Sequence, residues 1–177
     1  MLKVFKVVTL LLVGYFGVMK FQSIKKSGSL GYWLAMGMDR LTFYNYVVVG
    51  FAVNGMLSAF VLIFHIFLIE HFYIPLFDLF MLIVMMFSSL FMLSSLFFFV
   101  NEAVDNSEIA FLTISLIYIV SLFFSDLNNP LNILLNAELY FTAANRFVLL
   151  AIQVGVASVF QYLGWRFHRD IDITLGG

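Results

Sequence analysis

His65, Glu70 and His71 are side chains of the types that bind zinc. A helical zinc site places its two histidines three or four residues apart, so that both lie on one face. His65 and His71 are six residues apart, which turns them about 120° away from each other on a helix. The spacing argues against a metal site, and we expect the chain to hold neither a metal nor another cofactor.

Three other acidic residues also form no catalytic arrangement. Glu102, Asp105 and Glu108 lie in a short stretch without basic residues, which predicts a solvated turn. The sequence contains no cysteine and no recognisable nucleophile–base pair, phosphate-binding loop or nucleotide motif. We therefore expect no catalytic residues in this chain, and a role as a non-catalytic subunit of a larger membrane complex.

Glu138 and Arg146 are charged residues whose expected role depends on how deep they lie in the membrane. Glu138 lies within Leu131–Phe141, an apolar stretch too short to cross a bilayer, and Arg146 follows it. We expect this stretch to lie on the outer face of the membrane or to dip into it. If it crossed instead, both residues would be charges inside the membrane, which mark functional sites by default.

The polar side chains above are carried by a chain that consists mostly of long apolar runs. Apolar residues make up 63% of the 177 residues and charged residues 11%, whereas a soluble domain has about half and about a quarter. A soluble fold cannot bury so much apolar surface. We predict an all-α, polytopic, integral membrane protein, 1–177, with short interfacial or re-entrant helices. The five predicted spans are 4–19, 43–69, 79–100, 109–124 and 147–165.

The first run, 4–19, has two interpretations. Lys3 and Lys6 precede or enter an apolar core, as in a secretory signal peptide. No small-x-small cleavage site occurs before Lys20, and we therefore expect a retained helix.

The distribution of basic residues predicts the orientation in the membrane. With five spans, the segment 20–42 and the C-terminal tail lie on one side, and together they hold six of the nine basic residues. That side is expected to be cytoplasmic, with the N-terminus and the segment 126–146 outside. Tyrosine and tryptophan mark the same ends of two spans, as in an interfacial belt: Tyr44, Tyr46, Tyr162 and Trp165.

Small residues recur at four-residue spacing in two of the spans. Gly50, Asn54 and Ser58 follow this spacing, and Ala151 and Gly155 repeat it. The spacing puts small side chains on one face, which lets helices pack closely in lipid. We expect a packing role, with Asn54 bonding across the contact, and a polar lining for a pathway is the alternative.

The segment between the first two spans contains an apolar stretch outside the predicted bilayer. It begins with basic residues, continues through glycines into Tyr32–Met38, and ends in Asp39 and Arg40. Such a stretch either lies in the membrane interface or docks on another protein.

This segment resembles the cytoplasmic coupling segment of type-2 ABC exporter permeases, where a charged residue, a glycine, a small residue and a leucine precede an arginine. The matching residues are Lys26, Gly28, Leu30 and Arg40. The resemblance implies docking on a separate ATPase subunit, with Leu34 and Met36 at the contact. The stretch 129–145 is similar to the re-entrant outer helices of that family. The family's usual first span has no counterpart here, and Gly37 stands near the position of its usual proline.

The sequence therefore favours a membrane-spanning subunit of an ATP-driven transporter in the cell (inner) membrane. Its expected partners are lipid, other membrane subunits and a peripheral ATPase subunit, and no basic stripe indicates nucleic acid.

The alternative is a small or accessory subunit of a proton-pumping respiratory complex, similar to NADH dehydrogenase, in an organelle inner membrane. The stretch ILLNAELYFTAAN faintly resembles the smallest membrane chains of that complex. That family places mid-span carboxylates on adjacent helices, whereas Gln153 occupies the later helix here. Burial of Glu138 at mid-membrane depth would favour this alternative. A purely structural or assembly protein is the third possibility.

Overall fold

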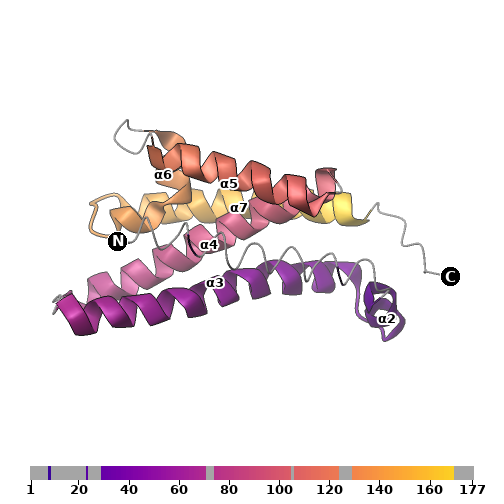
Figure 1. The fold of residues 1–177 in the computed structure, drawn as a ribbon, viewed down its shortest axis with the longest axis horizontal. Coiled ribbons are helices and arrows are strands. Elements are labelled where there is room, and N and C mark those ends of the chain that lie inside the picture. Colours follow the sequence, from indigo (N-terminus) through magenta and orange to yellow (C-terminus); the bar gives the residue numbers. More distant parts are fainter. Residues whose placement is uncertain are drawn as a thin grey trace.

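The computed structural model describes residues 8, 23, 29–70, 74–104, 106–123 and 129–169 (Figure 1). This part of the chain contains no strand, so the all-α prediction is confirmed for it. Its elements are α2 (Ser29–Ala35), α3 (Arg40–Glu70), α4 (Leu76–Val104), α5 (Ser107–Phe123), α6 (Pro130–Leu135), the 3₁₀ helix η1 (Ala137–Tyr140) and α7 (Arg146–Arg169).

Several predicted features lie outside these residues. The first predicted span, 4–19, is among them apart from Val8. Lys26, Gly28, His71 and Asp105 also lie outside. Among the residues singled out above, Leu30, Ser58, His65 and Glu70 lie in the helices, but their side chains are not described.

The helices coincide with the other predicted apolar runs. α3, α4, α5 and α7 contain or overlap the runs 43–69, 79–100, 109–124 and 147–165. Pro75 directly precedes α4, and Pro130 is the first residue of α6. At such positions the missing N–H of proline leaves no helical hydrogen bond unmade. The two prolines therefore set helix starts and leave the helix interiors unbroken.

Two helices of the described part, α4 and α7, are long and apolar enough to cross a membrane. The 29 residues of α4 span about 43 Å at 1.5 Å per residue, more than the ~30 Å of a hydrocarbon core. The outward face of α5 is also apolar, with Leu116 and Phe123 64% and 80% exposed. Apolar side chains on such outward faces are consistent with contact with lipid.

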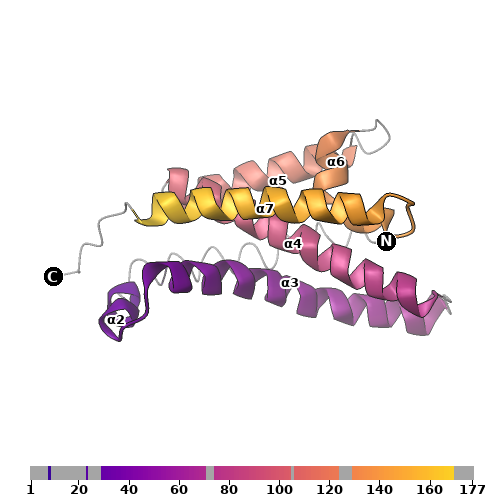
Figure 2. The same ribbon diagram turned by 180° about the vertical axis from the view of Figure 1, so that it is seen from behind.

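α4 lies at the centre of the bundle. It packs against α3, α5, α7 and η1, and Figures 1 and 2 show α3 on one side of it, with α5 and α7 on the other. The main core between these helices consists of aromatic and aliphatic side chains such as Phe43, Phe97 and Ile114. A hydrogen bond also crosses this core, because the Ser94 hydroxyl of α4 donates to the Val48 carbonyl of α3 at 2.7 Å.

Close helix contacts involve glycines other than the predicted ones. A Cβ on Gly164 would collide with the Tyr44 hydroxyl, and a Cβ on Gly55 would press against a side chain of α4. No described atom lies within 4 Å of a Cβ placed on Gly50 or Gly155. A packing role for these two residues therefore stays a prediction about contacts beyond the described part of the chain.

Candidate functional site

A sharp corner joins α2 to α3. Gly37 adopts a φ of 89°, a left-handed conformation that favours glycine. Asp39 then caps α3, because its carboxylate accepts from the Thr42 N–H at 2.5 Å and from the Thr42 hydroxyl at 3.0 Å. These bonds, the backbone one foremost, hold the pKa of the Asp39 carboxyl below its usual value. Local residues thus fix both the turn and the start of the next helix.

The two faces of this corner have different surroundings. Leu34 and Met38 are half-buried and pack against the main core. Tyr32, Trp33 and Met36 point outward, with exposed fractions of 63%, 43% and 65%. The two predicted contact residues therefore face different ways: Met36 is exposed, whereas Leu34 packs α2 against the bundle. Arg40, the first residue of α3, is half-buried.

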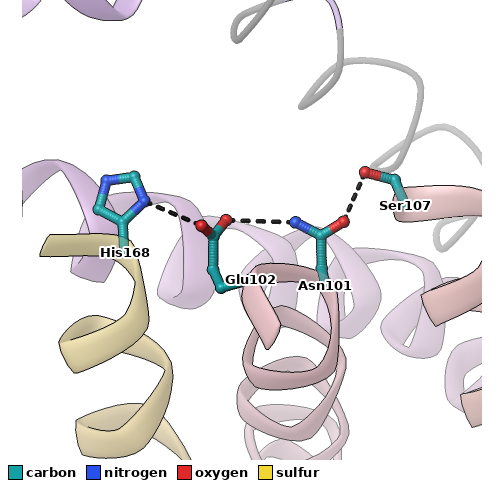
Figure 3. A network of polar contacts seen from close by, with 4 residues as sticks. All are labelled: Asn101, Glu102, Ser107 and His168. Atoms are coloured by element: carbon teal, nitrogen blue, oxygen red, sulfur yellow. Dashed lines mark hydrogen bonds and ion pairs between the residues drawn. The ribbon is translucent and has the colours of Figure 1, made fainter. Parts of the chain in front are cut away.

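Four polar side chains form a buried network where α4, α5 and α7 meet (Figure 3). His168 Nδ1 of α7 lies 3.3 Å from Glu102 Oε2 of α4. The Asn101 amide donates to Glu102 Oε1 at 3.2 Å, and the Ser107 hydroxyl of α5 donates to Asn101 Oδ1. We call these residues the end cluster. It links the last turns of two helices to the first turn of a third.

The position of Glu102 corrects the predicted solvated turn. Glu102 is only 4% exposed, whereas Glu108 is exposed as expected. The reason is that α4 continues to Val104, beyond the predicted end at residue 100, and carries Glu102 towards α7. The sequence also gave no role to His168. The one available signal is that both residues stand at the end of an apolar helix.

The first turn of α3 closes over the His168 ring. Phe43 stacks on the ring with centroids 6.3 Å apart, and Tyr44 is tilted against it at 5.5 Å. The Tyr44 hydroxyl lies against Gly164, one turn before His168 on α7. The Tyr44 hydroxyl and His168 Nε2 are both buried and have no hydrogen-bond partner among the described residues. The imidazole is thus enclosed by aromatic rings on one side and a carboxylate on the other.

A second polar network lies in the middle of the bundle. The Ser89 hydroxyl of α4 donates to Glu138 Oε2 at 2.6 Å. The Gln153 amide of α7 donates to Ser89 Oγ at 2.8 Å and to the Leu134 carbonyl at 2.5 Å. We call Ser89, Glu138 and Gln153 the middle cluster. It ties η1 and the end of α6 to α4 and α7.

Part of the stretch 131–141 packs inside the helix bundle, and its expected place on or in the outer face of the membrane stays a prediction. Glu138 is 1% exposed and bonds to Ser89, which lies midway along α4. The break between α6 and η1 is lined by polar side chains, and the Asn136 amide donates to Asn132 Oδ1 at 2.9 Å. Irregular backbone inside a membrane bundle needs such internal partners. Glu138 is thus buried at the mid-height of α4.

Arg146 lies at one end of the bundle, whereas Glu138 lies near the middle of α4. It forms an ion pair with Asp78 at 2.9 Å, and the same nitrogen donates to the Phe141 carbonyl at 3.0 Å. Its guanidinium also lies 4.8 Å from the centroid of the Phe77 ring. Asp78 and Arg146 stand in the first turns of α4 and α7, so this pair marks the end of the bundle opposite the end cluster.

The side chains of the end cluster and the middle cluster can form hydrogen bonds, and Glu102, Glu138 and His168 can also bind protons. Among the described residues, no group of three or more histidine, cysteine, aspartate or glutamate side chains could hold a metal ion. No protein-family model, curated protein or solved structure matches the chain. The residues themselves therefore carry the functional argument.

Proposed function

We propose that this chain is a membrane-spanning permease subunit of an ATP-driven exporter, in which α2 docks on a separate ATPase subunit. The observation that carries the proposal is the α2–α3 corner. α2 is fixed to the bundle by Leu34 and Met38 and turns an apolar face outward through Trp33 and Met36. A short helix held in this way can transmit a push from a partner to α3.

The order of the elements gives further support. In the proposal α3, α4, α5 and α7 are four of five spans, with 4–19 as the first. α4 and α7 have the length and apolar composition that crossing requires. The re-entrant pair α6 and η1 stands between the last two spans, as in the exporter permeases that the sequence resembles.

Purification of the tagged chain in mild detergent tests the proposal. A nucleotide-binding subunit with ATP hydrolysis activity should co-purify. Met36→Asp should weaken its retention about tenfold or more, which corresponds to at least about 1.4 kcal/mol at an interface residue. Leu34 is less suitable for this test, because a charge there would disturb the packing of α2 on the core.

Leu76→Asp is the matched control, since Leu76 is 83% exposed at the first residue of α4, far along the chain from the corner. It should leave the ATPase bound. Absence of an ATPase from the wild-type preparation, or its full retention by both Met36→Asp and Trp33→Asp, would reject the proposal.

The second candidate is a subunit of a proton-pumping respiratory complex. The observation in its favour is the burial of Glu138 at the mid-height of α4. Against it, the other helices of the middle cluster contribute Ser89 and Gln153 rather than a second carboxylate. Co-purification with a large respiratory assembly in place of an ATPase would select this candidate.

A further inference from the structure

The side chain of His168 joins several helices at one end of the bundle. It belongs to α7, contacts Glu102 of α4, and lies against Phe43 and Tyr44 of α3. The network continues through Asn101 to the start of α5 (Figure 3). The corner that carries α2 lies directly before Phe43 in the chain. This imidazole therefore lies at the end of the bundle where α2 is attached.

One proton makes this buried pair electrically neutral. The side chains of Glu102 and His168 are 0% and 2% exposed. An isolated charge in apolar surroundings is strongly disfavoured, whereas a carboxylate beside an imidazolium carries no net charge. The amide of Asn101 also donates to Glu102 Oε1 at 3.2 Å, as it would to a carboxylate. Loss of the proton would leave one net negative charge buried.

We propose that Glu102 and His168 form a proton-binding site that clamps the C-terminal end of α7 to the α2–α3 corner. With the proton bound, the neutral pair stays buried and the helix ends stay together. When the imidazolium gives its proton to water, the remaining negative charge draws water in, and the end of α7 separates from α3. No bond between heavy atoms changes, and the site holds under either candidate function.

The other titratable or charged groups around this site are not histidines. Arg40 and Tyr44 belong to α3, and Glu108 of α5 and Arg166 of α7 are exposed. Histidine is the side chain that ordinarily titrates between about pH 5 and 8, whereas carboxyl, phenol and guanidinium groups ordinarily titrate outside that range. A pH-dependent transition that is lost when His168 is replaced therefore reports the proposed site.

Distance measurements between two spin labels test the clamp in the whole chain. The sequence has no cysteine, so Met36→Cys and Tyr162→Cys place labels only on the corner and on α7, at side chains that are 65% and 57% exposed. The distance distribution should be narrow at about pH 5 and should broaden reversibly by about pH 9. In His168→Gln it should be broad at every pH, because the carboxylate has lost its counter-charge.

Two controls separate the clamp from other effects. The double variant His65→Gln, His71→Gln removes the other two histidines and should keep the transition. Gln161→Leu removes a hydrogen bond from α7 to Asn45 of α3 that does not titrate, and should also keep it.

The proposal is overturned if the wild-type distribution does not change over this range, or if His168→Gln keeps the change. If that variant does not fold, the ¹⁵N signals of the wild-type histidines decide. The His168 imidazolium must titrate together with the distance change, and titration without movement rejects the clamp.

Discussion

The end cluster and the middle cluster each contain one carboxylate buried in an apolar bundle, but the two carboxylates have different partners. Glu138 in the middle accepts from a neutral hydroxyl, Ser89, whereas Glu102 at the end lies against an imidazole. The middle cluster holds the break between α6 and η1 inside the bundle, and the end cluster joins the ends of continuous helices. The two buried carboxylates thus lie where helices end or break, Glu102 in the last turn of α4 and Glu138 in η1.

Removing the imidazole should have the largest effect on stability. His168→Ala leaves Glu102 buried without its counter-charge, and we expect a loss of about 3–5 kcal/mol in the free energy of unfolding. Unfolding in mixed micelles with increasing denaturing detergent measures it. Adding Glu102→Gln to the variant should restore part of the loss. If the second change destabilises further by a similar amount, the pair does not act through its charges.

Replacing Gly164, which lies one turn before His168 on α7, should have the second-largest effect on stability. Gly164→Ala forces Tyr44 and the backbone of Phe99 away from α7, and we expect a loss of about 2–3 kcal/mol. Gly155→Ala, on the open part of the same helix, should change stability by less than about 0.5 kcal/mol. The same unfolding measurement compares the two variants. Equal effects would contradict the contact between α3 and α7.

A change in the middle cluster should cost less than the loss of the imidazole. Gln153→Leu removes the donor to Ser89 and to the Leu134 carbonyl, which are buried polar groups, and we expect a loss of about 1–2 kcal/mol. Hydrogen exchange of the backbone should increase in α6 and η1 while α3 is unaffected. An increase spread evenly over the bundle would mean that the cluster does not specifically hold α6 and η1.

The ion pair at the opposite end should matter least. Asp78→Asn removes the partner of Arg146, but both side chains keep 20–25% exposure to solvent. Such pairs contribute at most about 1 kcal/mol, and their effect declines with salt. Thermal unfolding at low and high salt measures it, and a loss as large as that of His168→Ala would place this pair inside an apolar environment.

Part of the candidate site followed from local sequence. The runs of apolar residues predicted the long helices. The helix starts at the two prolines and the corner made by Gly37 and Asp39 were not predicted, although local residues set both. These features depend on residues within a turn or two of one another. The predicted segment 20–42 accordingly contains the corner, although the sequence did not separate Leu34 from Met36 by their direction.

The sequence by itself determined where the long apolar helices of the described part lie and that the chain is far more apolar than a soluble domain. Both follow from composition and from the order of neighbouring residues. Only the tertiary structure decided which polar side chains meet. Glu102 and His168 are 66 positions apart, and Ser89 and Gln153 are 64 apart. Each residue along a helix turns the side chain by about 100°. The crossing of the helices therefore decides whether a carboxylate faces solvent, as predicted for Glu102, or a histidine from another helix, as the structure shows.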